Sequence, residues 1–157
     1  MEIRRFGPGH RRPEGPPGTQ GLTGQVIWND ERANVAELAF SRRGLIPPHE
    51  NPNTTLFIVV SGGGWVQVGD ELVRINHGEA VVWPPDVPHG AYTDGSEMRA
   101  IVVELRDASD AARVLAGAGE VISVEAAAPP SAEPARGALA DRPTARDAHD
   151  ETEGEPW

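Results

Sequence analysis

The chain reads GLIPPHENPNTTLFIVVSG over residues 44–62 and GEAVVWPPDVPHGAYT over residues 78–93. Each segment joins a short run of β-branched or aromatic residues to turn-forming Gly, Pro or Asn, which is typical of strands that end in tight turns. Each segment also carries one histidine, His49 in the first and His89 in the second. The fold class and the candidate site both follow from these two segments.

Short apolar runs rich in Val, Ile, Trp and Phe recur on both sides of the quoted segments, roughly every eight to twelve residues. They are too short for amphipathic helices, and Gly69-Asp70 between two of them predicts a tight hairpin turn. The three glycines at 62–64 predict a break between two strands. This spacing is typical of an all-β sandwich or barrel. The expected strands cover residues 25–28, 34–40, 55–60, 65–68, 71–75, 80–83 and 98–105.

A chain of 157 residues suits one domain of ordinary size. Asp107 is a candidate cap for a short helix that stops at Gly117, and residues 121–124 are a candidate edge strand. Beyond Ala126 the chain is mostly Ala, Pro, Glu, Asp and Arg, which bury too little surface to offset ordering, so we expect disorder. The expected divisions are an N-terminal arm with a Gly/Pro loop (1–22), a barrel (23–105), the helix with the edge strand (106–125) and a disordered acidic tail (126–157).

Composition excludes several classes of function. The formal net charge of -10 argues against a nucleic-acid partner, and we expect the arginines of residues 1–12 to form a solvated arm. The absence of cysteine excludes disulfides, thiolate metal sites and thiol catalysis. No apolar run has the length of a membrane span, and the first residues lack the apolar stretch of a secretion signal. We therefore expect a cytoplasmic protein without a membrane partner.

Together the two quoted segments resemble the two sequence motifs of the cupin superfamily, whose members are small β-barrels. The first motif contains Gly, a spacer, His-x-His, a Glu and a final Gly. His49 and Gly62 match the first His and the final Gly. Asn51 stands at the second His and Thr55 at the Glu. The resemblance implies a small single-domain cupin with an incomplete metal-ligand set.

The second cupin motif is represented by Gly78, Pro84 and His89 at the expected spacings. Asp86 replaces its inner Gly, and Thr93 replaces its final Asn. The resemblance therefore implies a double-stranded β-helix, the cupin or jelly-roll barrel, followed by the short C-terminal helix and the disordered tail.

In metal-binding cupins, the histidines and the Glu of the two motifs hold a divalent ion inside the barrel. The resemblance implies His49, His89 and Asn51 as candidate ligands for a divalent metal ion in this chain. Because residues i and i+2 of a strand share a face, Asn51 should face inward with His49, and Glu50 should face away.

The candidate ligand pocket joins polar groups to aromatic walls, the usual composition of a small-molecule site. Core packing is the alternative role for its aromatic residues. The run Phe57-Ile58-Val59-Val60 is apolar at every position, which indicates burial on both faces and favours a homodimer. The expected pocket residues are His49, Asn51, Thr55, Phe57, Trp83 and His89.

Three functions fit these observations. The first is a cupin-fold protein that binds a small organic ligand, or a weakly held divalent metal, inside the barrel. The second is a metal-dependent enzyme of the dioxygenase, isomerase or cyclase type that uses His49 and His89. The third is a structural dimeric module whose pocket is filled by side chains. The first two require that both imidazoles meet inside the barrel.

Overall fold

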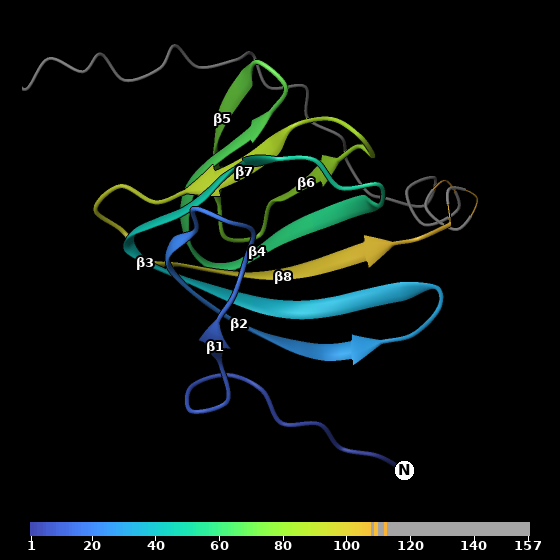
Figure 1. The fold of residues 1–157 in the computed structure, drawn as a ribbon. Coiled ribbons are helices and arrows are strands. Elements are labelled where there is room, and N and C mark those ends of the chain that lie inside the picture. Colours follow the sequence, from blue (N-terminus) through green and yellow to red (C-terminus); the bar gives the residue numbers. More distant parts are fainter. Residues whose placement is uncertain (108, 110–111, 113–157) are drawn as a thin grey trace, which may run out of the picture.

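The computed structural model describes residues 1–107, 109 and 112, and Figure 1 shows how their strands are arranged. The expected C-terminal helix, the candidate edge strand at 121–124 and the tail lie outside the described residues. Within the described part of the chain, no helix has the length and apolar character needed to cross a membrane.

The described residues form an all-β fold, as the sequence predicts, and its eight strands all pair antiparallel. The Gly69-Asp70 turn joins two strands whose register begins at Val68 and Glu71, which confirms the expected hairpin. The strands are β1 (Arg12–Pro13), β2 (Gln20–Asn29), β3 (Ala33–His49), β4 (Thr54–Val68), β5 (Glu71–Asn76), β6 (Ala80–Trp83), β7 (His89–Tyr92) and β8 (Met98–Leu105).

Two long strands close the barrel. Both β3 and β4 pair with β8 through their first halves and with β7 through their second halves. The order β2-β3-β8-β4-β6 makes one sheet, and the order β3-β7-β4-β5 makes the facing sheet (Figure 1). Because β3 and β4 belong to both sheets, the four strands β3, β7, β4 and β8 form a closed ring.

The glycines at 62–64 do not end a strand, and the expected break is wrong. β4 runs through them, with a register shift between Val59 and Ser61. Gly62 has a positive φ of 72°, and a Cβ atom there would lie 1.9 Å from the carbonyl oxygen of Glu97. Glycine therefore lets β4 bend closely past a neighbouring strand and cross from one sheet to the other.

Two further strand expectations need correction. β3 does not end near Phe40 but continues to His49, so it carries the first histidine at its end. β7 was not expected, because its four residues include a Gly and a His and no β-branched side chain. Pairing with β3 on one side and β4 on the other holds these residues in a strand that their own sequence does not predict.

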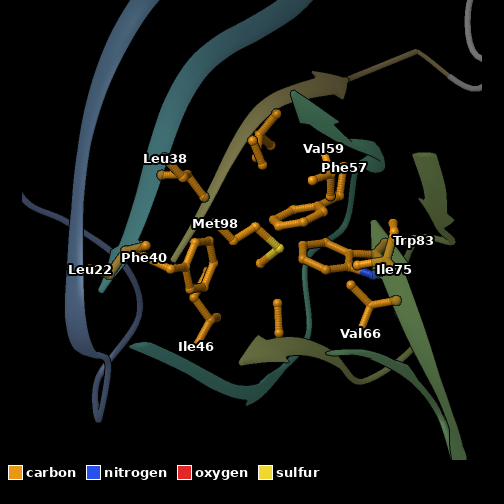
Figure 2. Packing of buried hydrophobic residues seen from close by; sticks show 13 residues of the cluster. Leu22, Leu38, Phe40, Ile46, Phe57, Val59, Val66, Ile75, Trp83 and Met98 are labelled. Carbon is orange, nitrogen blue, oxygen red and sulfur yellow. The ribbon is translucent and has the colours of Figure 1, made fainter. Parts of the chain in front are cut away.

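The core lies between the two sheets and follows strand alternation. Phe57, Met98 and Ala100 are fully or almost fully buried, with Trp83 and Phe40 packed against Phe57 (Figure 2). Each large apolar side chain buried in this way contributes about 1.5–3 kcal/mol relative to an exposed one.

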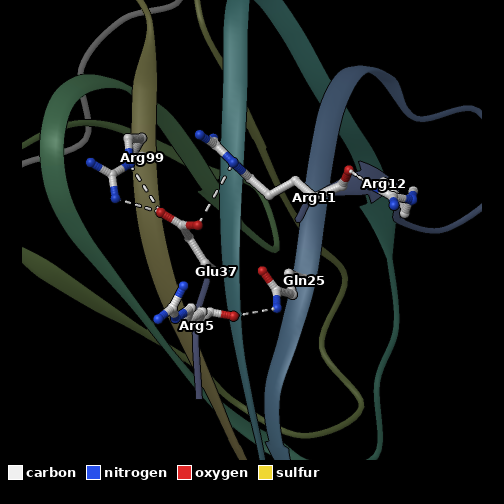
Figure 3. A network of polar contacts seen from close by, with 6 residues as sticks. All are labelled: Arg5, Arg11, Arg12, Gln25, Glu37 and Arg99. Atoms are coloured by element: carbon white, nitrogen blue, oxygen red, sulfur yellow. Dashed lines mark hydrogen bonds and ion pairs between the residues drawn. The ribbon is translucent and has the colours of Figure 1, made fainter. Parts of the chain in front are cut away.

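The N-terminal segment packs on the outer face of the barrel and is not simply solvated. Glu37 points outward from β3, yet its side chain has no exposed surface. Arg99 donates to its carboxylate through Nε at 3.0 Å and Nη2 at 2.5 Å, and Arg11 lies 3.7 Å away (Figure 3). Gln25 also donates to the carbonyl oxygen of Arg5 at 2.9 Å. The guanidinium groups of Arg99 and Arg11 compensate for burial of the Glu37 charge.

Candidate functional site

The two motif histidines meet inside the barrel. His49, at the end of β3, is the register partner of His89, the first residue of β7. Their ring centroids lie 4.6 Å apart with the ring planes at 60°. His89 is buried, whereas His49 is partly exposed. Residues far apart in sequence therefore form a compact imidazole pair.

Backbone carbonyl groups orient both rings. His49 Nδ1 lies 3.1 Å from the carbonyl oxygen of Pro47, and His89 Nδ1 lies 2.8 Å from that of Val87. A carbonyl oxygen only accepts, so each Nδ1 must donate its proton. In the neutral form of each ring the lone pair is then on Nε2, and neither Nε2 has a hydrogen-bond partner within the described residues.

Burial lowers the pKa of His89 below its ordinary value of 6.5, and the nearby His49 lowers it further. The hydrogen bond to Val87 and the charge of Glu104 act in the opposite direction and are outweighed. His89 is therefore a neutral imidazole at neutral pH, able to accept a proton or a hydrogen bond at Nε2.

An aromatic stack holds His89 in place. Its ring stacks on Trp83 with centroids 4.5 Å apart and the planes at 23°. Phe57 packs against Trp83 with centroids 4.8 Å apart. Phe57, expected in the ligand pocket, thus belongs to the core behind Trp83.

A polar row crosses the other sheet, β2-β3-β8-β4-β6, at the same end of the barrel. Asn34 on β3 pairs with Glu104 on β8, which pairs with Thr55 on β4, which pairs with Trp83 on β6. Direct register partners present their side chains on one face of a sheet. Thr55 is only 1% exposed, and its Oγ1 has no hydrogen-bond partner within the described residues.

Glu104 is held by two side-chain amides. Asn34 Nδ2 donates to Oε2 at 3.2 Å, and Asn51 Nδ2 donates to Oε1 at 3.1 Å. The oxygen of the Asn51 side chain accepts from the backbone N–H of Asn53 at 2.9 Å. Because a carboxylate only accepts hydrogen bonds, these contacts fix the orientation of both amides.

A cavity of about 140 Å³ lies between the histidine pair and the polar row. Five of the six expected pocket residues line it, and Phe57 does not. Sequence reasoning missed Glu104, although it continues the inward alternation of Met98, Ala100 and Val102 and is the charged member of that series. The lining residues are Glu14, Gly15, Pro16, Leu22, Val26, Asn34, Ala36, Leu38, Ile46, His49, Asn51, Thr55, Trp83, His89, Val102 and Glu104.

Two departures from the second cupin motif have structural roles. Asp86 stands where the motif has Gly and adopts a positive φ of 57°, and its N–H donates to the Asn51 carbonyl oxygen at 2.9 Å. Thr93 stands where the motif has Asn and is buried. Its Oγ1 donates to the Ser41 carbonyl oxygen at 2.5 Å and accepts from the Gly44 N–H at 2.7 Å.

The residues present do not fit a firmly held metal ion. Among the residues that the structure describes, no group of three or more His, Asp or Glu side chains is placed to hold one. His49 and His89 supply two nitrogen donors, while the amide oxygen of Asn51 is already engaged by Asn53. Structural and catalytic metal sites usually have at least three protein ligands.

The fold and the paired histidines define a small β-barrel with an internal cavity of the cupin type. The family described as "Cupin domain" (Cupin_2) matches residues 40–105, which contain both motifs. Residues 40–105 of this chain therefore form a cupin domain. No curated protein matches its sequence significantly.

Solved structures with the same fold come from several bacteria. The polyketide cyclase RemF from Streptomyces resistomycificus is 22% identical, with a TM-score of 0.58 over 68% of this chain and 81% of that one. A cupin 2 conserved barrel domain protein from Rhodopseudomonas palustris is 16% identical (TM-score 0.57; 73% and 93% covered). KdgF from Halomonas sp. is 20% identical (TM-score 0.55; 64% and 91% covered). At these identities the likeness establishes the fold alone.

Proposed function

We propose that this cupin binds a small organic ligand in the cavity between the histidine pair and the polar row. The observation that carries the proposal is the buried Thr55 hydroxyl, which lines the cavity and lacks a partner within the described residues. A buried hydroxyl without a hydrogen bond is costly, so a partner supplied by a ligand would stabilise the site.

The size and walls of the cavity support a small ligand. Its volume of about 140 Å³ is close to the roughly 150 Å³ of an engineered protein cavity that holds benzene. Leu22, Leu38 and Val102 line one part of it, and His49 and His89 line another. The buried part of the ligand is therefore about the size of one aromatic ring.

The alternative is a metal-dependent cupin enzyme that uses His49 and His89. Its support is the anchoring of each Nδ1 by a backbone carbonyl, which leaves Nε2 available, an arrangement that is usual for metal-binding histidines. The two-donor set favours, at most, a weakly held divalent ion, so ligand binding without a firmly held metal is the preferred function.

Metal content and melting temperature separate the two functions in protein purified without a histidine tag. We expect melting temperatures that do not respond to added divalent ions and that rise with benzyl alcohol, a neutral probe of suitable size. Near-stoichiometric metal that is lost in His49→Ala and His89→Ala, and kept in the exposed control His77→Ala, would instead support the enzyme. Indifference to divalent ions and to neutral, cationic and anionic probes of this size would leave only the structural module.

We also propose that two copies associate through the outer face of β8, β4 and β6. Register pairing places Val103, Leu56 and Val82 in one outward row, next to a second row with Ile101 and Ile58. Val82 is 37% exposed, and the others are partly exposed. A contiguous apolar patch of this kind on a sheet is typical of a protein interface.

A further inference from the structure

All the charged side chains that line the cavity within the described residues are acidic. The charged side chains that line it are the carboxylates of Glu14 and Glu104, and within the described residues no Lys or Arg lines it. An anionic ligand would enter against this charge, whereas a cation would be attracted.

Glu104 is not neutralised by the protein. Its two hydrogen bonds are with the neutral amides of Asn34 and Asn51, and within the described residues it forms no ion pair, although its charge acts on the nearby His89. An ionised carboxylate offers about four acceptor positions, so roughly two remain after these contacts. Partly buried carboxylates are normally paired with a positive group.

Two neighbouring acceptors also lack donors. The Asn34 amide turns its nitrogen to Glu104, which leaves its Oδ1 as a buried acceptor without a partner in the described part of the chain. Thr55 Oγ1, on the other side of Glu104, is also buried without a hydrogen-bond partner within the described residues. Asn34, Glu104 and Thr55 are consecutive in the polar row and all line the cavity.

We propose that the ligand of this cavity carries a primary ammonium group on a small apolar body. A primary ammonium has three N–H donors, and the polar row offers the three acceptors Asn34 Oδ1, Glu104 and Thr55 Oγ1. The apolar body would pack on Ala36 and Val102, which follow the polar row in the next inward positions of β3 and β8. This inference rests on the proposed ligand-binding function and specifies its ligand class.

Three probes of similar size and different charge test the ligand class: benzylammonium, benzyl alcohol and benzoate. Calorimetric titration at neutral pH should show benzylammonium binding about tenfold or more tightly than benzoate, because a hydrogen-bonded charge pair forms only with the cation. Equal affinity, or a preference for benzoate, overturns the proposal. Binding of benzyl alcohol with no preference for the cation overturns the ligand class and leaves the proposed function standing, whereas failure of all three probes overturns both.

Substitutions locate the ammonium position. Glu104→Gln keeps the side-chain shape and removes the charge, so we expect benzylammonium affinity to fall about tenfold with benzyl alcohol affinity unchanged. Glu71→Gln, on the exposed start of β5 outside the cavity, is the matched control and should change neither affinity. If Glu104→Gln does not fold, the nearly isosteric Thr55→Val should still weaken benzylammonium about threefold or more. Unchanged affinity in a folded variant of either kind contradicts the proposal.

Discussion

At the residue scale, His89 illustrates how position alters chemistry. Its ring stacks on Trp83, donates from Nδ1 to the Val87 carbonyl oxygen and lies beside His49. These contacts fix its orientation, while burial favours its uncharged form and lowers its pKa. A surface histidine such as His77 has the same intrinsic chemistry without this environment.

The lowered pKa of His89 predicts a pH dependence of stability. Below its ordinary value of 6.5, the unfolded chain protonates this histidine while the folded protein resists protonation. The unfolded state then binds more protons than the folded state. The free energy of unfolding therefore has its full value above pH 6.5 and falls as the pH decreases toward the pKa of His89 in the folded protein. Urea denaturation across this range should show a shallower decline for His89→Asn than for the native chain. The control His77→Asn should retain the native slope, and an unchanged slope in His89→Asn would refute the assignment.

Asp86 shows that a departure from a motif can preserve its geometry. The cupin motif has Gly at this place, and Asp86 adopts the left-handed conformation, with a φ of 57°. Asp tolerates this region better than most residues that carry a Cβ.

We therefore expect Asp86→Val to lower the free energy of unfolding by about 1–2 kcal/mol, because a β-branched residue is strained at a positive φ. Asp86→Gly should be neutral or slightly stabilising, since it removes the strain. Urea denaturation of both variants measures the difference. Equal stability of the Val and Gly variants would show that the backbone conformation does not limit this position.

At the element scale, the bend of β4 determines how the two sheets share their strands. Before the bend, β4 pairs with β8 and β6, and after it β4 pairs with β7 and β5. Thr55 therefore lies in one sheet and Val68, the register partner of His89, lies in the other. β3 crosses between the sheets in the same way and lines both sides of the cavity, with Asn34 in one sheet and His49 in the other.

Gly62→Ala should be strongly destabilising for two separate reasons, its positive φ and the clash of the new Cβ with the Glu97 carbonyl oxygen. Gly78→Ala is the matched control, because Gly78 also has a positive φ but nothing lies within 4 Å of its ideal Cβ position. We expect about 1–2 kcal/mol for Gly78→Ala and at least about 1–3 kcal/mol more for Gly62→Ala. Chemical denaturation checks both values, and similar losses would mean that β4 moves freely away from β8.

At the scale of the whole molecule, the two faces of the first sheet differ in what covers them. The inner face packs against the second sheet around Phe57. On the outer face, the N-terminal segment covers β2 and β3 around Glu37. The outward side chains of Leu56 and Val82 remain partly exposed. The proposed dimer would cover this remaining area.

The double variant Leu56→Glu/Val82→Glu should convert a dimer into a monomer, because four buried negative charges would face one another across the interface. Analytical ultracentrifugation measures the mass, and circular dichroism verifies that the barrel stays folded. Arg74→Glu, on the exposed face of β5, is the control and should leave the dimer intact. A native chain that is monomeric at every concentration tested would contradict the interface.

Much of the fold could be predicted from local pattern. The expected strands at 80–83 and 98–105 coincide with β6 and β8, and the motif residues identify the cupin barrel. The same pattern reasoning was wrong at residues 62–64, because glycine permits a bend as well as a break. Pattern reasoning also missed β7, which is a strand because it pairs with β3 and β4.

The sequence by itself determined the strand rhythm, the inward alternation and the two motif histidines, because each depends on residues close together along the chain. Only the tertiary structure decided that Glu104 enters the cavity with Asn34 and Asn51, which contact it across 70 and 53 positions. It likewise decided that Phe57 stands behind Trp83. These relations depend on strand register and on the bends of β3 and β4, which long-range pairing sets and local pattern does not encode.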